Sequence, residues 1–575
     1  MATGVACAAP ARLSTEAERS GFRVTGRYDE TLALCKAFEK TYPTAVRCHT
    51  FGTTPEGRPM VALIATRSGA RTPAQARHKG LPVLLVQGGI HAGEIDGKDA
   101  GFMALREVLD KRQAPGALEK QVLVFVPVFN VDGHERFGAW NRPNQRGPEA
   151  MGWRTTAQNY NLNRDYAKAD APEMQAMLSL VNAWDPILTV DLHVTDGAKF
   201  QHDIAIMVEP VHSGDEGLRP LGLELRSAVL SDLTTAGSSP LPFYPSFVVE
   251  DDPSTGFADG VSSPRFSTGY FQTRNRFGML VETHAWRTYP ERVRSTFHTV
   301  VSVLAQTARH GPRWLEAARK ADKHAASLGG QALALSFEAS PKARTIAFRG
   351  YAYTRTPSEV SGALMTRYDE TTPEVWNVPL RDEVLPQLTV NAPKHGYWVP
   401  AAHAAQVRAK LLQHGISHQV STHARSAAPV EVFRATSAHW GSQSSEGRQR
   451  LDLQGQWAPE ARTIPAGSLF VPIGQAKARL VMALLEPQAP DSLVAWGMFN
   501  HAFEAKEYME AYVAEDVARA QLAADPALAR AFVARLQSDP AFAKNPQARL
   551  EFFARRHSSW DERYMLYPVM RTDTP

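Results

Sequence analysis

Four runs of consecutive apolar residues recur along the first half of the chain, and each one ends in polar residues. The runs cover residues 83–97 (VLLVQGGIHAGEIDG), 121–130 (QVLVFVPVFN), 187–193 (ILTVDLH) and 278–284 (GMLVETH). Such runs are typical of strands buried on both faces, as in a parallel sheet covered by helices. Helical periodicity over 96–109 supplies a crossover between the first two strands. The pattern predicts an α/β domain with a mixed, mostly parallel sheet flanked by helices.

Other elements surround these strands. Residues 28–42 have the spacing of an amphipathic helix, and 45–51 and 60–65 that of two strands joined by a turn. Residues 133–165 are rich in Asn, Arg, Gly and Pro with little apolar periodicity, which predicts a long functional loop. We expect two helices over 291–328 to close the domain.

The pattern of apolar and polar residues changes after residue 328. Short alternating runs, such as ARTIAFRGYAYT, begin near residue 333, and amphipathic helical stretches dominate the end of the chain. We therefore divide the chain into a tail or remnant of a targeting segment (1–20), a first domain (21–328), an α+β or β-rich module (333–473) and a helical C-terminal region (474–575).

The polar ends of the strands carry the candidate chemistry, because ligands of open α/β sheets bind at the carboxyl edge. His91 and Glu94 stand three apart on one turn and can bind one cation, a pair that suits zinc. The same spacing also fits an ordinary helix start with a Glu near the helix dipole. A catalytic zinc needs a third protein ligand. His193 is the best candidate, with His202 and His134 as rivals.

A general base is also expected. Glu282 ends an apolar strand, where burial raises a carboxyl pKa, so it could take a proton from water activated by the metal. The alternative is a structural pairing of Glu282 with Arg274, Arg276 or His284.

Composition narrows the class of protein. A chain of 575 residues is too long to fold around a single hydrophobic core, so more than one domain is expected. Its net charge of +4 is small for this length. We find no basic run with interleaved aromatics, so no nucleic-acid partner is expected, and no stretch of about twenty apolar residues that would span a membrane. Cys35 and Cys48 are either bridged or two unrelated buried thiols. If the small-residue N-terminus is a truncated signal, the protein is periplasmic or secreted; otherwise it is cytoplasmic.

The joint order of these motifs resembles the zinc carboxypeptidase family, whose familiar member is carboxypeptidase A. The resemblance covers about residues 21–328 and rests on HAGE, an Arg nine residues before the N-R pair in GWRTTAQNYNLNRDY, DLH and VET. It implies a bacterial-type member with a long C-terminal extension. By resemblance, one Zn²⁺ is bound by His91, Glu94 and His193, Glu282 activates water, Arg154 stabilises the oxyanion, and Asn163 and Arg164 bind the substrate carboxylate.

Two positions depart from the family. An acidic residue often stands two positions before the Asn of the N-R pair and orients a zinc-binding His, but here the position is Asn161. An amide oxygen can still accept an imidazole N–H, with weaker support. The family's mobile tyrosine has no certain counterpart, and Tyr270 is carried only as a guess.

The expected function is zinc-dependent hydrolysis of the C-terminal peptide bond, with a peptide bearing a free C-terminal carboxylate as substrate. A zinc amidohydrolase or deacylase, or a cell-wall peptide hydrolase, fits the same metal site. A further alternative is a metal-holding domain with a ligand-binding module in the second half. The second half could also cap the cleft and restrict substrate size. Neither side-chain preference nor oligomeric state follows from the sequence.

Overall fold

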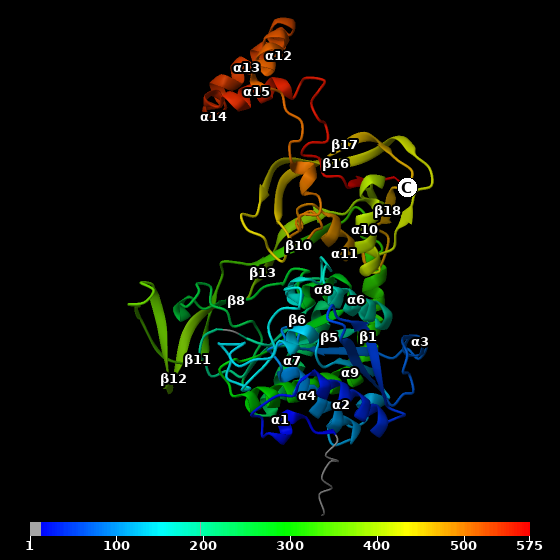
Figure 1. Ribbon diagram of the computed structural model, residues 1–575, viewed down its shortest axis with the longest axis vertical. Helices are drawn as coiled ribbons and strands as arrows, with labels where there is room; N and C mark the ends of the chain where they lie inside the picture. The colour runs from blue at the N-terminus through cyan, green and yellow to red at the C-terminus, as the bar shows by residue number, and fades with distance from the viewer. Residues whose placement is uncertain (1–12, 196, 575) are drawn as a thin grey trace, which may run out of the picture.

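The computed structural model describes residues 13–195 and 197–574, and it divides into stacked parts along its long axis (Figure 1). The first half of the chain forms the large lower part, a β-rich module lies above it, and a helical lobe stands at the far end. No helix formed by the described residues has the length and apolarity that crossing a bilayer requires.

An eight-stranded mixed sheet is the centre of the first domain, in the order β1-β2-β4-β3-β5-β9-β6-β7. The four strands predicted from the apolar runs, β4, β3, β5 and β9, are neighbours and run parallel. They lie in the middle of the sheet because both of their faces are apolar. The strands are β1 (Val46–Thr53), β2 (Pro59–Ala65), β3 (Val83–Gly88), β4 (Val122–Val126), β5 (Leu188–Val194), β6 (Ile204–Glu209), β7 (Pro240–Leu241) and β9 (Phe277–Thr283).

Helices flank this sheet as expected, and the predicted crossover helix is α4 (Asp96–Leu109). One expectation was wrong: residues 291–328 do not form two helices, because α9 (Tyr289–Ala325) continues through Pro312. The other helices are α1 (Glu16–Arg19), α2 (Tyr28–Thr41), α3 (Pro73–His78), α5 (Val131–Glu135), α6 (Pro172–Trp184), α7 (Arg219–Thr235) and α8 (Ser267–Thr273).

The predicted N-terminal tail is partly a packed element. Residues 1–12 lie outside the described part of the chain, but Leu13 and Ala17 are fully buried in the main core. Glu18 on α1 forms an ion pair with Arg106 on α4 at 2.6 Å. Residues 13–20 therefore belong to the first domain, because their apolar side chains cover part of its core.

The second half is β-rich and shares the core of the first domain. A six-stranded sheet has the order β15-β18-β14-β19-β16-β17, and β10 pairs with β13. β11 and β12 form a long hairpin that β8 of the first domain extends by parallel pairing with β12. The strands are β8 (Phe257–Ala258), β10 (Ala332–Ala339), β11 (Arg344–Pro357), β12 (Leu364–Arg381), β13 (Val384–Asn391), β14 (Gly396–Val399), β15 (Gln419–Val420), β16 (Arg425–Trp440), β17 (Leu451–Ile464), β18 (Leu469–Pro472) and β19 (Met570–Thr572).

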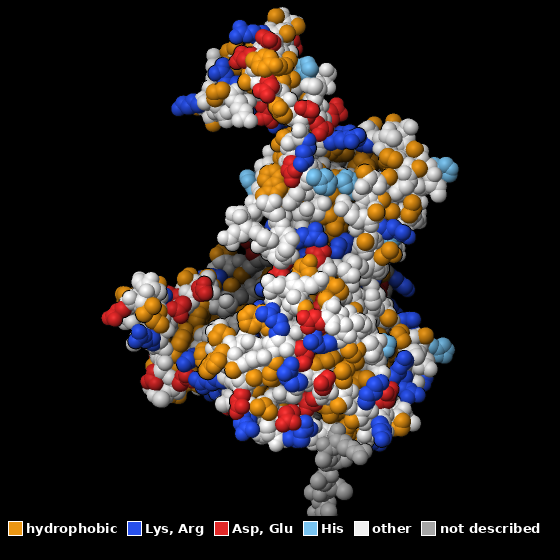
Figure 2. Space-filling model, in the orientation of Figure 1, with side chains coloured by type: hydrophobic (Ala, Val, Ile, Leu, Met, Phe, Trp, Pro, Cys, Tyr) orange, Lys and Arg blue, Asp and Glu red, His pale blue; other side chains and the backbone are white. Residues whose placement is uncertain are grey.

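The region after residue 473 is not wholly helical, since β19 returns to the six-stranded sheet. α10 (Ala401–Gln413) and α11 (Ala478–Leu485) pack toward the first domain, and every residue of α11 is buried. The helical lobe stands apart from the body (Figure 2) and has its own small core of phenylalanines. It consists of α12 (Ala511–Ala524), α13 (Pro526–Ser538), α14 (Pro540–Lys544) and α15 (Pro546–Ala554).

Candidate metal centre and active-site cleft

The turn between β3 and α4 holds His91 and Glu94 at the carboxyl edge of the sheet. Gly88 ends β3, and a Cβ atom there would lie 2.9 Å from the Pro127 carbonyl oxygen, so the close packing of the turn favours glycine. The Glu94 N–H donates to the His91 carbonyl oxygen at 2.9 Å. His91 Nδ1 lies 2.9 Å from Glu94 Oε1.

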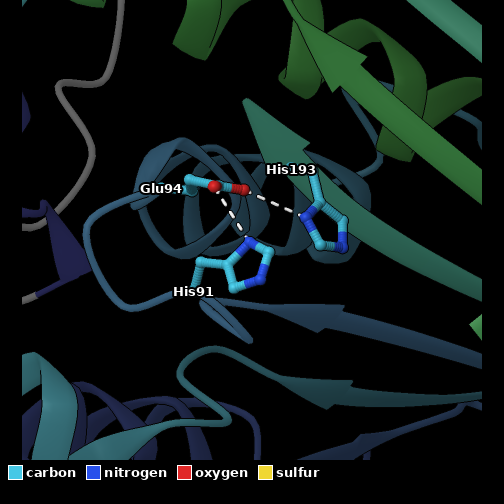
Figure 3. A group of neighbouring side chains, drawn as sticks. All are labelled: His91, Glu94 and His193. Atoms are coloured by element: carbon cyan, nitrogen blue, oxygen red, sulfur yellow. Dashed lines mark hydrogen bonds and ion pairs between the residues drawn. The ribbon is translucent and has the colours of Figure 1, made fainter. Parts of the chain in front are cut away.

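His193 reaches the same point from β5. Leu192 pairs with Gly88 across the two parallel strands, so His193 stands one residue beyond the end of β3. Its Nδ1 lies 3.0 Å from Glu94 Oε2, so the Glu94 carboxylate contacts one nitrogen of each imidazole ring (Figure 3). The three side chains are buried and offer ligand atoms that lie within 4.8 Å of one another.

The rival histidines lie elsewhere. His134 Nε2 is 3.3 Å from the Gly26 carbonyl oxygen, and His202 Nδ1 is 3.3 Å from the Ser239 carbonyl oxygen. Neither belongs to the His91–Glu94–His193 group. Both rival histidines therefore contact backbone carbonyl oxygens away from the site. His193 is the third member of the candidate ligand group.

An outer partner holds the far nitrogen of each candidate ligand ring. His91 Nε2 lies 3.1 Å from Asn161 Oδ1, and His193 Nε2 lies 3.1 Å from Asp191 Oδ2. In both rings the Nδ1 atom faces the Glu94 carboxylate, and the Asn161 contact orients the His91 ring. Asn161 thus occupies the orienting position on which the sequence departs from the family. Sequence reasoning assigned no role to Asp191, although its position two residues before His193 places both on one face of β5.

Glu94 remains ionised despite its burial. Burial alone would raise its pKa, but His91 and Arg142 outweigh that effect and hold the pKa of Glu94 well below its ordinary value. Arg142 Nη2 lies 3.0 Å from Glu94 Oε1. Arg142 comes from the irregular loop, where no periodicity marks a residue as buried, so the sequence did not reveal it.

Glu282 lies beside the centre, opposite His193 in the register between β5 and β9. Burial raises the pKa of Glu282 to about 8, and Glu94 and Asp191 add to the rise while His193 opposes it. Its Oε2 makes no hydrogen bond within the described part of the chain. Among the described residues, no ion pair joins Glu282 to Arg274, Arg276 or His284. Arg274 and Arg276 pair with Asp185 instead.

A cleft of about 590 Å³ opens over the centre. Seven of the eight predicted site residues line it: His91, Glu94, His193, Glu282, Arg154, Asn163 and Arg164. Arg154 Nη1 lies 3.6 Å from Glu94 Oε1. The Arg164 guanidinium lies 4.5 Å above the Phe266 ring. Burial, and then the neighbouring cations Arg154 and Arg265, lower the pKa of Arg164. This clustering of cations favours an anionic group of a ligand.

The guess for the closing tyrosine was wrong. Tyr270 is fully buried, and its hydroxyl lies 3.0 Å from His414 Nδ1, away from the cleft. The phenol that lines the cleft is Tyr244, which is 39% exposed and near enough to Arg164 to influence its pKa. Tyr244 stands in the loop after β7, far from every motif, so no pattern in the sequence pointed to it.

The cleft is also lined by two further carboxylates, an imidazole and a guanidinium. Of the polar residues Ser263, Arg265, Ser267, Thr268 and Arg274, which stand before β9, Thr268 lines the cleft and the other four do not. Sequence reasoning missed the two further carboxylates, the imidazole and the guanidinium, because they come from β6, α7 and two separate loops that meet only in the fold. These residues are Glu209, His212, Arg226 and Asp259.

Two imidazoles and one carboxylate are the donors of many catalytic zinc sites, and the orientation of both Nδ1 atoms fits one metal ion. Beside them stand a buried carboxylate base and a cationic wall. The fold and this site define a metal-dependent hydrolase of acyl or peptide bonds.

Comparison with known protein families finds a match in the first half of the chain. Residues 31–203 match the model of the zinc carboxypeptidase family, and this segment contains His91, Glu94 and His193. Over this segment the chain is similar to the zinc carboxypeptidases, a family of zinc enzymes, and the buried His-Glu-His group lies within it. Glu282 lies beyond the matched segment, so its role is argued from geometry.

A search of curated proteins returned no match. Solved structures similar to this chain include a metallo-carboxypeptidase from Burkholderia cenocepacia, with 15% identity, 48% of this chain and 68% of that chain covered, and a TM-score of 0.36. Carboxypeptidase A from Helicoverpa armigera has 15% identity, coverage of 51% and 74%, and a TM-score of 0.36. These scores are too low to transfer any property of those proteins to this chain.

Proposed function

We propose that this protein removes the C-terminal residue from peptides that end in a free carboxylate. One observation carries the proposal: the cleft over the His91–Glu94–His193 group is also lined by Asn163, Arg164 and Glu282. A terminal carboxylate needs a fixed cation with a planar fork, which Arg164 supplies. The amidohydrolase and cell-wall alternatives share the metal site but place no such demand on Arg164.

The residues divide the work of hydrolysis. Asn163 and Arg164 bind the substrate carboxylate and thereby position the scissile bond over Glu282. When bound by His91, Glu94 and His193, zinc supplies a Lewis acid that acidifies water and polarises a carbonyl. Glu282 accepts the proton of the attacking water at a carboxylate oxygen and then delivers it to the leaving amine. Arg154 stabilises the negative charge that develops on the carbonyl oxygen.

The test is hydrolysis of matched peptides with a free or an amidated C-terminus, followed by mass spectrometry. The free peptide should lose one residue and the amidated peptide should be stable. Arg164→Lys keeps the charge but loses the fork, and should raise KM by about 10- to 100-fold, as expected for a lost charged hydrogen bond. Equal cleavage of both peptides, with no effect of Arg164→Lys, would reject the carboxypeptidase assignment in favour of an amidohydrolase.

We further propose that the protein acts outside the cytoplasm, in the periplasm or after secretion. Cys35 on α2 and Cys48 on β1 form a disulfide, and such bonds persist in oxidising compartments. The intact mass of protein prepared from its own cells without reductant should lack two hydrogens, and the protein should be found in the periplasmic or secreted fraction. Recovery in the cytoplasm with both thiols free would contradict the proposal.

A further inference from the structure

The hairpin between β16 and β17 brings a carboxylate to the substrate-binding loop from the second half of the chain. Glu446 lies at its tip, and its Oε2 accepts the backbone N–H of Asn161 at 2.9 Å. Glu446 has a φ of 52°, in the left-handed region that non-glycine residues seldom adopt. Residues held in this region cluster at functional sites, where the surrounding structure fixes them.

Asn161 connects Glu446 to two parts of the site. Its Oδ1 accepts both from His91 Nε2 at 3.1 Å and from the Asn163 N–H at 3.0 Å. A shift of the Asn161 backbone would therefore turn the His91 ring and displace Asn163 at the same time. Glu446 also lies close enough to Arg164 to favour its charged form.

Two further contacts hold the hairpin and the module against the same region. Arg448, two residues after Glu446, makes a two-armed ion pair with Asp170 at 2.9 and 2.7 Å. Asp491 accepts the Arg265 backbone N–H at 2.8 Å, next to the Phe266 ring on which Arg164 lies. The second half thus contacts Asn161, Asp170 and Arg265, which lie close to Arg164 or Phe266 in the sequence. Residues 337–339 of β10 complete the cleft wall.

We propose that Glu446 is a positioning residue of the active site, acting through Asn161 on His91 and on the Asn163–Arg164 pair. The proposal rests on the proposed function for its effect on substrate, but its effect on His91 does not need hydrolysis. It assigns the module after residue 328 a part in building the cleft, beyond the segment that matches the family.

Three variants separate the possible roles of the tip. Glu446→Ala removes the acceptor, and Glu446→Gln keeps an acceptor oxygen without the charge. Gln443→Ala is the matched control, because Gln443 is exposed on the same turn. Removing a direct outer partner of a metal ligand costs about 10- to 100-fold in affinity, so one bond further out we expect Glu446→Ala to weaken Zn²⁺ binding by about threefold to tenfold.

The experiment measures Zn²⁺ affinity by competition with a chelator, together with kcat, KM and the melting temperature of each full-length variant. Glu446→Ala should weaken Zn²⁺ binding and raise KM, while Glu446→Gln recovers Zn²⁺ affinity and Gln443→Ala matches wild type in all readouts. Wild-type Zn²⁺ affinity and KM in Glu446→Ala would overturn the proposal. So would a loss matched by Gln443→Ala or tracking only a lower melting temperature. Because Zn²⁺ affinity is measured without peptide, it decides the role of Glu446 even if no peptide is cleaved.

Discussion

At the scale of single residues, Glu282 has the environment of a proton acceptor. It is buried beside His193, with a raised pKa and a carboxylate oxygen that makes no hydrogen bond among the described residues. Glu282→Gln should lower kcat by about 100- to 10,000-fold, the range for loss of a general base. Zinc content should stay at the wild-type level, since Glu282 is not a proposed ligand. Elemental analysis and steady-state kinetics check both expectations, and a variant that kept wild-type turnover would exclude Glu282 as the base.

Asn161 makes a second residue-scale prediction. Asn161→Leu removes the acceptor for His91 Nε2, and we expect a loss of Zn²⁺ affinity of about 10- to 100-fold. Asn161→Asp restores a stronger acceptor, so its Zn²⁺ affinity should equal or exceed that of wild type. Chelator competition measures both. If Asn161→Leu bound Zn²⁺ as tightly as wild type, the observed contact would have no orienting role.

At the scale of elements, the sequence predicted the central strands and their polar ends because apolar runs leave little ambiguity. The sequence predicted two helices where the structure has the single helix α9, because proline lacks an N–H and usually ends a helix. Gly311 and Pro312 lie inside α9 all the same, and there Gly311 packs closely against Pro82. It misplaced the tyrosine because Tyr244 stands on an irregular loop that only the fold brings to the cleft.

His414, at the end of α10, links the module to the first domain and predicts a pH dependence. It is fully buried, with Nε2 donating to the Ala167 carbonyl oxygen at 2.9 Å and Nδ1 lying 3.0 Å from the Tyr270 hydroxyl. Burial lowers the pKa of His414 to about 3. The pKa of a histidine in the unfolded chain is about 6.5. Between this pH and about pH 3, the unfolded chain therefore binds more protons than the folded chain. Stability is therefore retained above pH 6.5 and falls as the pH drops below it.

The change from pH 7 to pH 5 should cost about 2 kcal/mol through this residue. Urea unfolding midpoints at the two pH values measure it in wild type and in His414→Gln, where the pH-dependent part should shrink. His423→Gln, at an exposed position, is the control and should behave as wild type. An equal acid loss in all three proteins would place the pH dependence elsewhere.

At the scale of the whole molecule, the two halves share one core. α11 is buried along its full length. Across the boundary, Asn275 donates to the Ala476 carbonyl oxygen and Lys477 donates to Asn182 Oδ1. The sequence predicted that the pattern of apolar residues changes near residue 333. It did not predict that the two halves share a hydrophobic core, because the contacts between them join residues hundreds of positions apart. Likewise, nothing near residue 446 in the sequence indicates that it reaches the site.

Two deletion variants test whether the two halves of the chain fold as one unit. A chain ending at Gly330 should aggregate or lack activity, since the apolar surface that α10 and α11 cover becomes exposed. Replacing residues 511–554 by a short linker should leave folding and peptide hydrolysis intact, because the helical lobe has a core of its own. Gel filtration and peptide hydrolysis provide the readouts. A soluble, fully active fragment ending at Gly330 would show that the second half is an appended module.

The central claim is that segments separated by about a hundred residues meet at one sheet edge to bind a single zinc ion. Anomalous diffraction at the zinc absorption edge, from crystals grown with Zn²⁺, tests it most directly. We predict one strong peak per chain, in contact with His91 Nδ1, a Glu94 carboxylate oxygen and His193 Nδ1. A map without a peak at this position, or with a peak there that His193 does not contact, would contradict the account.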